Sequence, residues 1–543
     1  MIGGGIAGLA TACLLAHHGV SVTLLERNEE LGGRVGRIRR HGFTFDTGPT
    51  LYLMDEAFDH FFSSVGTSTE AELSVRKLDP AYRVFPEGAA AFDVPRGVDR
   101  VADLFESLEP GAGARLRDYL DGVALAYRMS LRYFLYTNFT AVRPYLRLEL
   151  VRRLPLLLDL LVTPLDRWVA RSFSDPRLRQ VLSYHSVFLS NRPSHTPALY
   201  ELISHTDLVQ GVGYPTGGMA AVTDALVRLA GSRGVNIRTS CEVTAITQRE
   251  GAATGVIAGE QLRADAVIAT VDRMHARELL EAGRAAEGTR HAAPGWPRGV
   301  GAGVRNLLSH GARRWPGLAR VLGGRRLPNP GISTVLAYLG VRGELPELAH
   351  HQLLLSRDWE RDFTAIFDAS GVSRSIYACR PTATEPGLAP EGREALYLLI
   401  PVAADESIGS GSAYRGTEPG DAQVERIVDD AIELLAERAA IPDLAGRIVS
   451  RTTLGPRDFA NRYCSYRGGA LGWAHTLWQS AFLRGSNASR LRGLYYAGAT
   501  ATPGVGVPMC LISAENVLKR MVGDTSPGPG LQFRRGAGRR RRP

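Results

Sequence analysis

The pattern of apolar and polar residues along the chain predicts alternating helices and strands. Residues 9–19 (LATACLLAHHG) carry apolar side chains at helical spacing and end at a glycine, which predicts a helix. The next stretch, VSVTLLE, is typical of a buried strand that ends at Glu26. The same criteria predict strands at 264–270, 333–341, 395–402 and 493–499, short strands around Gly251, and helices at 217–234 and 512–522.

Three stretches interrupt this alternation. Residues 99–214 are rich in leucine and arginine and predict a helical region that prolines break. Residues 282–331 are rich in glycine, arginine, proline and histidine, which predicts a loop. Beyond Gly523 the chain consists mainly of proline, glycine and arginine, which predicts disorder.

Composition indicates a soluble protein with more than one domain. A chain of 543 residues is too long for one hydrophobic core. It contains no run of about 20 apolar residues that would predict a transmembrane helix. Its start does not resemble a secretory signal. The five cysteines form no Cys-x-x-Cys pair, so we expect no metal site, no disulfide framework and a reducing compartment.

The net charge of +9 depends largely on the last ten residues, RRGAGRRRRP, which hold six arginines. Such a run can contact nucleic acid or anionic lipid, or it can be a disordered, solubilising tail. No nucleic-acid motif accompanies it, so we expect no nucleic-acid partner.

The chain opens with a Gly-x-Gly-x-x-Gly pattern formed by Gly3, Gly5 and Gly8. These glycines permit a tight turn, close approach of a pyrophosphate and close packing of helix on strand, respectively. Glu26 follows Gly8 by 18 residues, close to the spacing at which an acidic residue binds ribose hydroxyls. The pattern therefore predicts a Rossmann-type dinucleotide site.

The strand that should precede this turn is almost missing. A first strand usually has about five or six residues, whereas only Met1 and Ile2 precede Gly3. That strand should be central in a parallel sheet and pair on both sides. We therefore expect the natural protein to begin a few residues upstream.

The residues after Glu26 indicate a flavin nucleotide. In LGGRVGR, Gly32 and Gly33 allow close backbone approach, and Arg34 can bind a phosphate or the flavin edge. This stretch and FTFDTGPT (43–50) resemble the flavoprotein family that includes amine oxidases and carotenoid desaturases, which implies FAD as cofactor.

The C-terminal third resembles the bacterial-type phytoene desaturases in particular. The stretch 457–484 contains the Gly-Ala…Gly and Gln-Ser elements of that family, and 493–518 contains its glycine-rich loop. The resemblance implies that FAD also contacts Val243, Gly498, Gly504, Val507 and Pro508. One departure is that Ala501 and Thr502 stand where the family usually has Thr-His, so the family histidine is absent.

The resemblance implies an α/β fold in which a discontinuous Rossmann-type FAD-binding domain receives an inserted α+β substrate domain and a helical, membrane-facing part. The expected segments are 1–95, 213–281 and 485–523 for FAD, 96–212 for the helical part, 282–484 for the substrate and 524–543 for the tail. It also implies desaturation of a long polyene, with a hydride passing to flavin and a neighbouring proton being lost. The electron acceptor is then oxygen or a quinone.

Two parts of this hypothesis have alternatives. Arg143 matches a family arginine near the reacting end of the substrate, but it can equally be a surface residue. Residues 149–173 combine dense leucines with flanking arginines and Trp168, which is typical of a monotopic interfacial helix or of a buried core helix. Membrane binding would place the protein in the cytoplasm at the inner face of the cell membrane.

Rival functions share these motifs. Carotenoid ketolases, isomerases and saturases of the family have the same cofactor site. An amine-oxidase-like enzyme with a soluble substrate would need an aromatic cage and no membrane patch. A flavin- or lipid-binding protein without activity would not need both FAD-contacting stretches.

Overall fold

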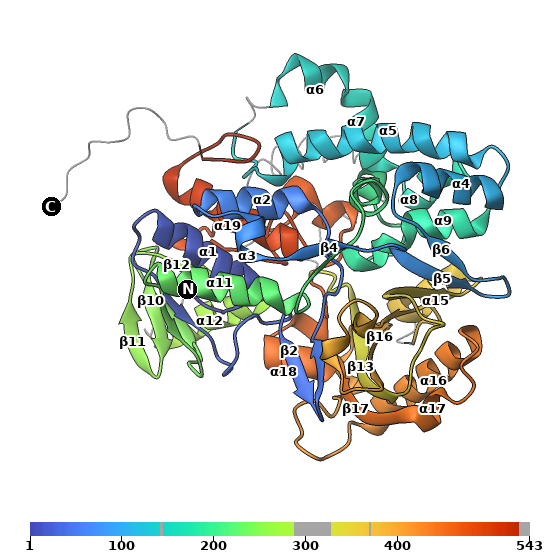
Figure 1. The fold of residues 1–543 in the computed structure, drawn as a ribbon. Helices are drawn as coiled ribbons and strands as arrows, with labels where there is room; N and C mark the ends of the chain where they lie inside the picture. Colours follow the sequence, from blue (N-terminus) through green and yellow to red (C-terminus); the bar gives the residue numbers. More distant parts are fainter. Residues whose placement is uncertain (142–144, 287–326, 369–370, 532–543) are drawn as a thin grey trace.

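The computed structural model describes residues 1–141, 145–286, 327–368 and 371–531 (Figure 1). A parallel sheet near the N-terminus holds the glycine-rich turn. In it β1 (Thr23–Leu25) pairs with β8 (Asn236–Arg238), and β12 (Val267–Ala269) pairs with β18 (Leu494–Tyr496). Ile2 joins the two pairs, because it bridges Leu25 on one side and Ala269 on the other. The first strand is therefore central, as predicted, although only Met1 and Ile2 occupy it.

Helices cover one face of this sheet, and a β-meander with one helix covers the other. α1 (Ile6–His17) is buried along most of its length and packs against α11 (Ala220–Ser232) and α19 (Val507–Val522). On the other side, α12 (Arg273–Ala286) packs against an antiparallel meander of β9 (Ala245–Arg249), β10 (Ala252–Ala258) and β11 (Glu260–Arg263). The helices predicted at 9–19, 217–234 and 512–522 are confirmed.

A second, seven-stranded sheet lies in the lower right of Figure 1. Its two longest strands, β13 (Ile332–Arg342) and β16 (Arg393–Ala403), pair antiparallel over their whole length, which confirms the strands predicted at 333–341 and 395–402. Its order is β17 (Ile448–Leu454), β13, β16, β15 (Ile376–Cys379), β14 (His351–Leu355), β5 (Tyr82–Pro86) and β6 (Phe92–Val94).

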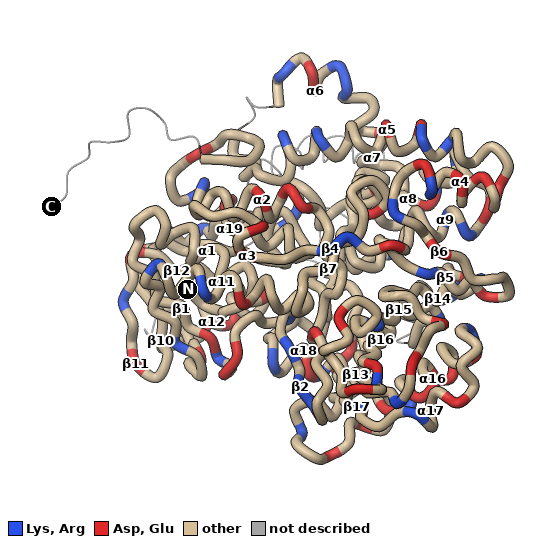
Figure 2. Tube along the Cα trace, in the orientation of Figure 1, with Lys and Arg blue, Asp and Glu red and all other residues tan. Residues whose placement is uncertain are grey.

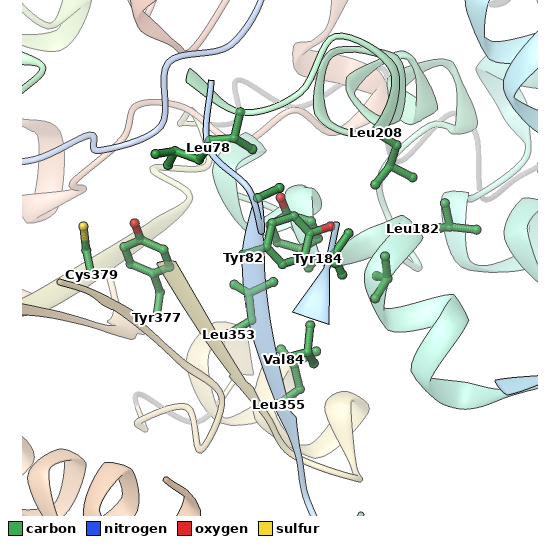
Figure 3. Close-up of a cluster of buried hydrophobic side chains, with 14 of the residues drawn as sticks. Leu78, Tyr82, Val84, Leu182, Tyr184, Leu208, Leu353, Leu355, Tyr377 and Cys379 are labelled. Atoms are coloured by element: carbon green, nitrogen blue, oxygen red, sulfur yellow. The ribbon is translucent and has the colours of Figure 1, made fainter. Parts of the chain in front are cut away.

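Two apolar layers hold this sheet in place. α16 (Ala422–Arg438) packs on one face, where Val424, Val428 and Leu435 are fully buried. The other face belongs to a core shared with the helical region, and Figure 3 shows Val84 and Leu353 of the sheet near Leu182 and Tyr184 of that region. The shorter elements near this sheet are α15 (Trp359–Asp368), α17 (Leu444–Arg447), α18 (Pro456–Tyr463), η7 (Pro381–Ala383), η8 (Pro386–Leu388), η9 (Glu406–Ile408) and η10 (Tyr466–Gly468).

The helical region lies at the upper right of Figure 1. Its principal helices are α4 (Val98–Leu108), α5 (Ala112–Ser130), η1 (Leu131–Leu135), α6 (Leu148–Arg152), α7 (Leu154–Val162), α8 (Leu165–Ala170), α9 (Pro176–Ser183), η3 (Tyr184–Leu189), η4 (Ala198–Glu201), α10 (Leu202–Ser204) and η5 (His205–Val209). The remaining elements are β2 (Arg37–Arg40), β3 (Phe43–Asp46), α2 (Asp55–Ser64), α3 (Thr69–Glu72), β4 (Val75–Lys77), β7 (Gly213–Pro215), η11 (Leu477–Gln479) and η12 (Ala481–Leu483).

Three sequence predictions need correction. The single helix expected within 149–173 is three short helices, because the chain leaves helical geometry at Arg153 and again at Thr163 and Pro164. The loop expected from residue 282 begins later, since α12 continues to Ala286; most of the rest of that segment lies outside the described residues.

The tail predicted to be disordered is placed against α19 in its first part, over residues 524–531. The Lys519 ammonium, which is 0% exposed, donates to the carbonyls of Tyr136 and Gly528. Gly530 N–H donates to the Glu515 carboxylate at 2.9 Å. The arginine-rich end of the tail lies outside the described residues.

Candidate functional site

A cavity of about 480 Å³ extends between the parallel sheet and the seven-stranded sheet. Most residues of the predicted cofactor site line it, and these define what we call the nucleotide end: Gly3, Gly5, Glu26, Gly32, Gly33, Arg34, Val243, Gly498, Val507 and Pro508. Gly8 and Gly504 do not line the cavity. They act from behind its wall.

The glycine-rich turn depends on missing Cβ atoms. Gly3 has φ +99°, and a Cβ there would lie 2.8 Å from the Thr270 hydroxyl. A Cβ on Gly8 would lie 2.0 Å from the Gly3 carbonyl oxygen, so only glycine lets α1 start so close to the strand. Gly5 precedes α1 and has no side chain to cap it, which leaves the first N–H groups of the helix available to an anion.

The glycine doublet packs directly against this turn. Gly32 N–H donates to the Gly4 carbonyl at 2.8 Å, and Gly32 has φ +103°. A Cβ on Gly32 would lie 2.5 Å from the Val35 carbonyl oxygen. Two stretches of backbone thus approach the same part of the cavity without intervening side chains.

Glu26 lies at the end of β1 and is buried. One carboxylate oxygen accepts the Gly4 N–H at 2.7 Å, and the other accepts the backbone and side-chain N–H groups of Asn28 at 2.9 Å. The carboxylate is therefore fixed at the cavity wall, next to the turn, where a ribose would meet it.

Arg34 brings a half-buried positive charge to the cavity. Its guanidinium donates to the Ser465 hydroxyl at 2.6 Å and to the Leu471 carbonyl at 3.4 Å, and its Nε has no partner among the described residues. Burial lowers the pKa of Arg34, and the nearby Asp272 carboxylate opposes that shift. Burial in turn raises the pKa of Asp272. A half-buried guanidinium whose Nε–H has no partner among the described residues suits an anionic ligand.

The loop at 498–506 is held from behind by two buried side chains that the sequence did not identify. Arg484 donates to the carbonyls of Ala499 and Ala501 in this loop, and also to those of Trp473 and Gln479. His475 accepts the Val505 N–H at Nε2 over 3.2 Å, and its Nδ1 lies 2.7 Å from the Tyr200 hydroxyl. Burial lowers the pKa of His475 well below its ordinary value of 6.5, so this imidazole is neutral.

His475 also explains Gly504. A Cβ on Gly504 would lie 2.3 Å from the His475 ring, so the glycine makes room for the imidazole. Thr502 stands in this loop where the resemblance predicts a histidine. In this chain a histidine from a preceding segment contacts the same loop.

Four more charged residues line the cavity beside the nucleotide end, namely Arg27, Glu242, Asp272 and Arg462. The described residues that line the remaining part are uncharged, and we call this part the apolar end. Its wall comes from η1, η3, η4, α10, the 47–54 loop and the seven-stranded sheet. The residues are Leu51, Leu53, Met54, Phe134, Leu135, Phe188, Leu189, Leu199, Tyr200, Leu202, Ile203, Thr334, Leu336, Tyr377, Tyr397 and Leu399. Among the described residues, no Asp, Glu, Lys or Arg lines this part of the wall.

The comparisons with known proteins agree with this geometry. Residues 6–306, more than half of the chain, match the family model described as flavin containing amine oxidoreductase. A carotenoid 3,4-desaturase of Haloarcula japonica is 36% identical over 96% of this chain and 98% of its own. The chain is a member of the carotenoid desaturase family. A zeta-carotene-forming phytoene desaturase of Myxococcus xanthus is 31% identical over 96% of this chain and 93% of its own.

The solved structures extend the fold to the amine oxidases. Cyclohexylamine oxidase from Brevibacterium oxydans superposes with a TM-score of 0.54 at 14% identity, covering 96% of this chain and 97% of its own. This carotenoid desaturase family member therefore has the FAD-binding fold of the amine oxidases, with mixed α/β content.

The cofactor of this desaturase family member is FAD, and the nucleotide end fits it. The backbone cradle around Gly5, the carboxylate of Glu26 and the free donor of Arg34 supply groups for a pyrophosphate and a ribose. Arg143, the predicted substrate-side arginine, lies outside the described residues. Sequence reasoning missed His475, Arg484 and the tyrosines Tyr377 and Tyr397; the first two lie inside the family-like stretch 457–484, which was the available signal.

Proposed function

We propose that this FAD-dependent oxidoreductase desaturates a long acyclic polyene of the carotenoid class. One observation carries the proposal: the FAD-binding end of the cavity continues into an end lined by apolar side chains and by no charged one. A hydrocarbon has no group for a charged side chain to bind, whereas apolar walls exclude water and fix its position. FAD, when bound, supplies the acceptor for the hydride.

The residues of the cavity wall would then position the polyene and exclude water from the site. Leu336 and Leu399 of the seven-stranded sheet line the cavity together with Leu51 and Leu53, and Tyr397 holds the 47–54 loop by donating to the Gly48 carbonyl at 3.1 Å. The seven-stranded sheet and the helical region would thus form the inserted, substrate-binding part of the chain. Oxygen or a quinone would reoxidise the flavin.

An amine-oxidase-like activity is the second candidate. Its predicted aromatic cage finds partial support in Tyr377 and Tyr397, whose ring centroids lie 6.2 Å apart with planes at 69°. Both hydroxyls are already engaged, with Thr50 and Gly48 respectively. The rings stand edge to face and offer no pair of parallel surfaces, so we favour the polyene.

Co-expression with a phytoene-producing pathway tests the activity. The expected result is a polyene with a longer conjugated system, identified by absorption and mass. A variant with Glu26→Gln should weaken FAD binding by about 10- to 100-fold, because a charged hydrogen-bond acceptor is lost. Unchanged polyene in cells that contain FAD-loaded protein would contradict the proposal, and a ketone or hydrated product would redirect it within the family.

We also propose that α6 and α7 rest on the membrane surface that holds the substrate. Seven large apolar side chains in this stretch are exposed: Leu146 (70%), Leu148 (62%), Val151 (51%), Leu154 (50%), Leu156 (38%), Leu158 (50%) and Val162 (65%). Figure 1 shows α6 at the edge of the molecule, and Figure 2 shows basic residues at both ends of this helix. No helix in the described part of the chain has the length and hydropathy needed to cross a bilayer.

The inner side of these helices reaches the cavity. Leu157 packs in a cluster with Phe134, and Leu160 packs in a cluster with Leu199. Phe134 and Leu199 are both part of the apolar end. A polyene leaving the bilayer at α7 would therefore be one side-chain layer from the cavity. This would place the protein in the cytoplasm, at the inner face of the cell membrane.

Vesicle flotation tests the membrane proposal. The triple variant Leu154→Ser/Leu158→Ser/Val162→Ser should lose most binding to vesicles of mixed neutral and anionic phospholipid, because interfacial binding scales with buried apolar area. The matched control is Val20→Ser/Val449→Ser/Val522→Ser, which removes side chains that are 43%, 42% and 44% exposed elsewhere. Equal flotation of the two variants with the vesicles would contradict the membrane proposal.

A further inference from the structure

Three potential metal ligands lie together behind the wall of the apolar end. They are His350, His351 at the start of β14 and Cys379 at the end of β15, and their ligand atoms all lie within 4.8 Å of one another. All three side chains are buried, at 5%, 1% and 1% exposed respectively. His351 and Cys379 are directly opposite each other in the antiparallel pairing of the two strands. Figure 3 shows Cys379 beside Tyr377 at the end of β15.

Each imidazole is oriented by a hydroxyl at its other nitrogen. Nδ1 of His350 lies 2.6 Å from the Thr384 hydroxyl, and Nδ1 of His351 lies 2.6 Å from the Tyr377 hydroxyl. When each Nδ1–H donates to its hydroxyl, each Nε2 presents a lone pair. Among the described residues neither Nε2 atom has a hydrogen-bond partner. This is how metal-binding histidines are usually supported, by a second group that fixes the tautomer.

Two unpartnered nitrogens at such depth need an explanation, because buried polar groups are nearly always satisfied. Both rings are more than nine-tenths buried, and each is held by one hydroxyl at Nδ1, which leaves the two Nε2 atoms without a partner among the described residues. The buried Cys379 thiol lies in the same cluster, so a cation bound there would give the unpartnered imidazole nitrogens a partner.

We propose that His350, His351 and Cys379 bind a zinc ion through two imidazole Nε2 atoms and one thiolate. Tetrahedral zinc with Zn–N near 2.05 Å and Zn–S near 2.3 Å holds its ligand atoms about 3.3–3.6 Å apart, so the side chains would rotate toward one another when the ion binds. Binding releases the Cys379 proton and leaves the oxidation state of every group unchanged. Solvent or a further side chain completes the coordination.

Such an ion would be structural. It would tie β14 to β15 and, through Thr384, to the turn after η7, directly behind Tyr377 in the cavity wall. The cysteine spacing alone indicates no zinc site, since the ligands come from two strands 28 residues apart and only their pairing joins them. The proposal is independent of the substrate and of the reaction.

Elemental analysis tests it directly. The FAD-loaded protein is dialysed against a chelator under reducing conditions, returned to zinc, and separated from free metal. We expect one zinc per chain in the wild type, and an affinity at least about 100-fold weaker in Cys379→Ser and in His351→Gln. Thr384→Val, which removes only the support of His350, should weaken binding by about 10- to 100-fold.

The control variants replace one cysteine and one histidine that lie outside the cluster. Cys13→Ser and His195→Gln should keep the full zinc content, since neither residue lies in the cluster. FAD content and thermal melting show whether each variant is folded, and Thr384→Val decides the matter if Cys379→Ser does not fold. Substoichiometric zinc in the reconstituted wild type, or equal zinc in the ligand variants and the controls, would overturn the proposal.

Discussion

The nucleotide end of the cavity is built from backbone and charge, whereas the apolar end is built from apolar side chains of many elements. At the nucleotide end and directly behind it, Gly3, Gly32 and Gly8 each occupy a position where a Cβ would meet a backbone or hydroxyl oxygen within 2.8 Å. The described residues named above for the apolar end include no glycine, so none of them depends on a missing Cβ. Gly48, in the adjoining 47–54 loop, does, because its Cβ would lie 2.4 Å from the Arg34 carbonyl oxygen. The first end therefore tolerates almost no change, while the second tolerates substitution if volume is kept.

The largest expected effect is at the nucleotide end, in Gly8→Val. The new side chain would collide with the Gly3 carbonyl, so either α1 or the turn must move, which costs about 3 kcal/mol or more. We expect loss of FAD and a lower free energy of unfolding in chemical denaturation. Gly122→Ala is the matched control, since its Cβ would meet nothing within 4 Å. Full FAD content in Gly8→Val would show that FAD binding does not depend on the missing Cβ atom of Gly8.

The next effect concerns the loop that joins the two ends. Arg484→Leu would leave four carbonyl oxygens without their donor, at a cost on the order of 3 kcal/mol. FAD content and protein stability should fall together. Replacement of the exposed Arg167 by leucine serves as the control. If Arg484→Leu retained FAD at wild-type affinity, the loop would not depend on this guanidinium.

A smaller effect, with a defined pH dependence, belongs to His475. Burial depresses the pKa of His475, so the folded protein holds its imidazole neutral. The stability that the neutral imidazole contributes is complete above its ordinary pKa of 6.5 and is lost as the pH falls below 6.5. His475→Gln removes this titration. The stability difference between wild type and variant should therefore shrink by about 1.4 kcal/mol per pH unit on acidification.

Urea denaturation at several pH values below 6.5 measures that difference. Other buried groups titrate in the same range, notably Asp207, whose pKa burial raises to about 7, but they are common to both proteins and cancel. His195→Gln, at an exposed position, should show a flat difference. A flat difference for His475→Gln as well would mean that this imidazole is not held neutral.

The smallest expected effect lies where the two ends meet. Tyr397→Phe removes one hydrogen bond, to the Gly48 carbonyl, and should cost about 1 kcal/mol. Thermal melting should detect the loss while FAD content stays at the wild-type level. A loss of FAD as large as that of Gly8→Val would show that the apolar end is no more tolerant than the nucleotide end.

The contrast between the ends also explains what the sequence could predict. Gly3, Glu26 and Arg34 belong to one turn–helix–strand–turn unit, so their spacing along the chain reflects their spacing in space. Most of the apolar end comes from short segments between residues 51 and 399, and no local pattern links them. His475 and Arg484 lie within a family-like stretch, but their roles depend on reaching a loop some 20 residues further on.

The predicted boundaries of helices and disordered segments were wrong where local geometry or a tertiary contact overrides composition. The apolar pattern of 149–173 is continuous, yet Arg153 and Thr163 leave the helix, and the proline after Thr163 fixes the second break. The composition of 524–531 predicts disorder, because it cannot show that Lys519 is buried under that segment. Arg143 and the arginine-rich end of the tail remain predictions.

The buried position of Lys519 has a consequence for the dynamics of the cavity wall and of the segment that follows α19. Its ammonium contacts the carbonyls of Tyr136, beside the cavity wall formed by η1, and of Gly528, after α19. The ammonium also pairs with the Glu515 carboxylate of its own helix at 3.4 Å. Departure of either segment would remove one carbonyl acceptor from this buried ion pair, so we expect both segments to open in one cooperative step rather than fray separately. Amide hydrogen exchange around residues 135–136 and 528–530 would then report a single opening free energy, shared by the wall of the cavity and the end of the FAD-binding fold.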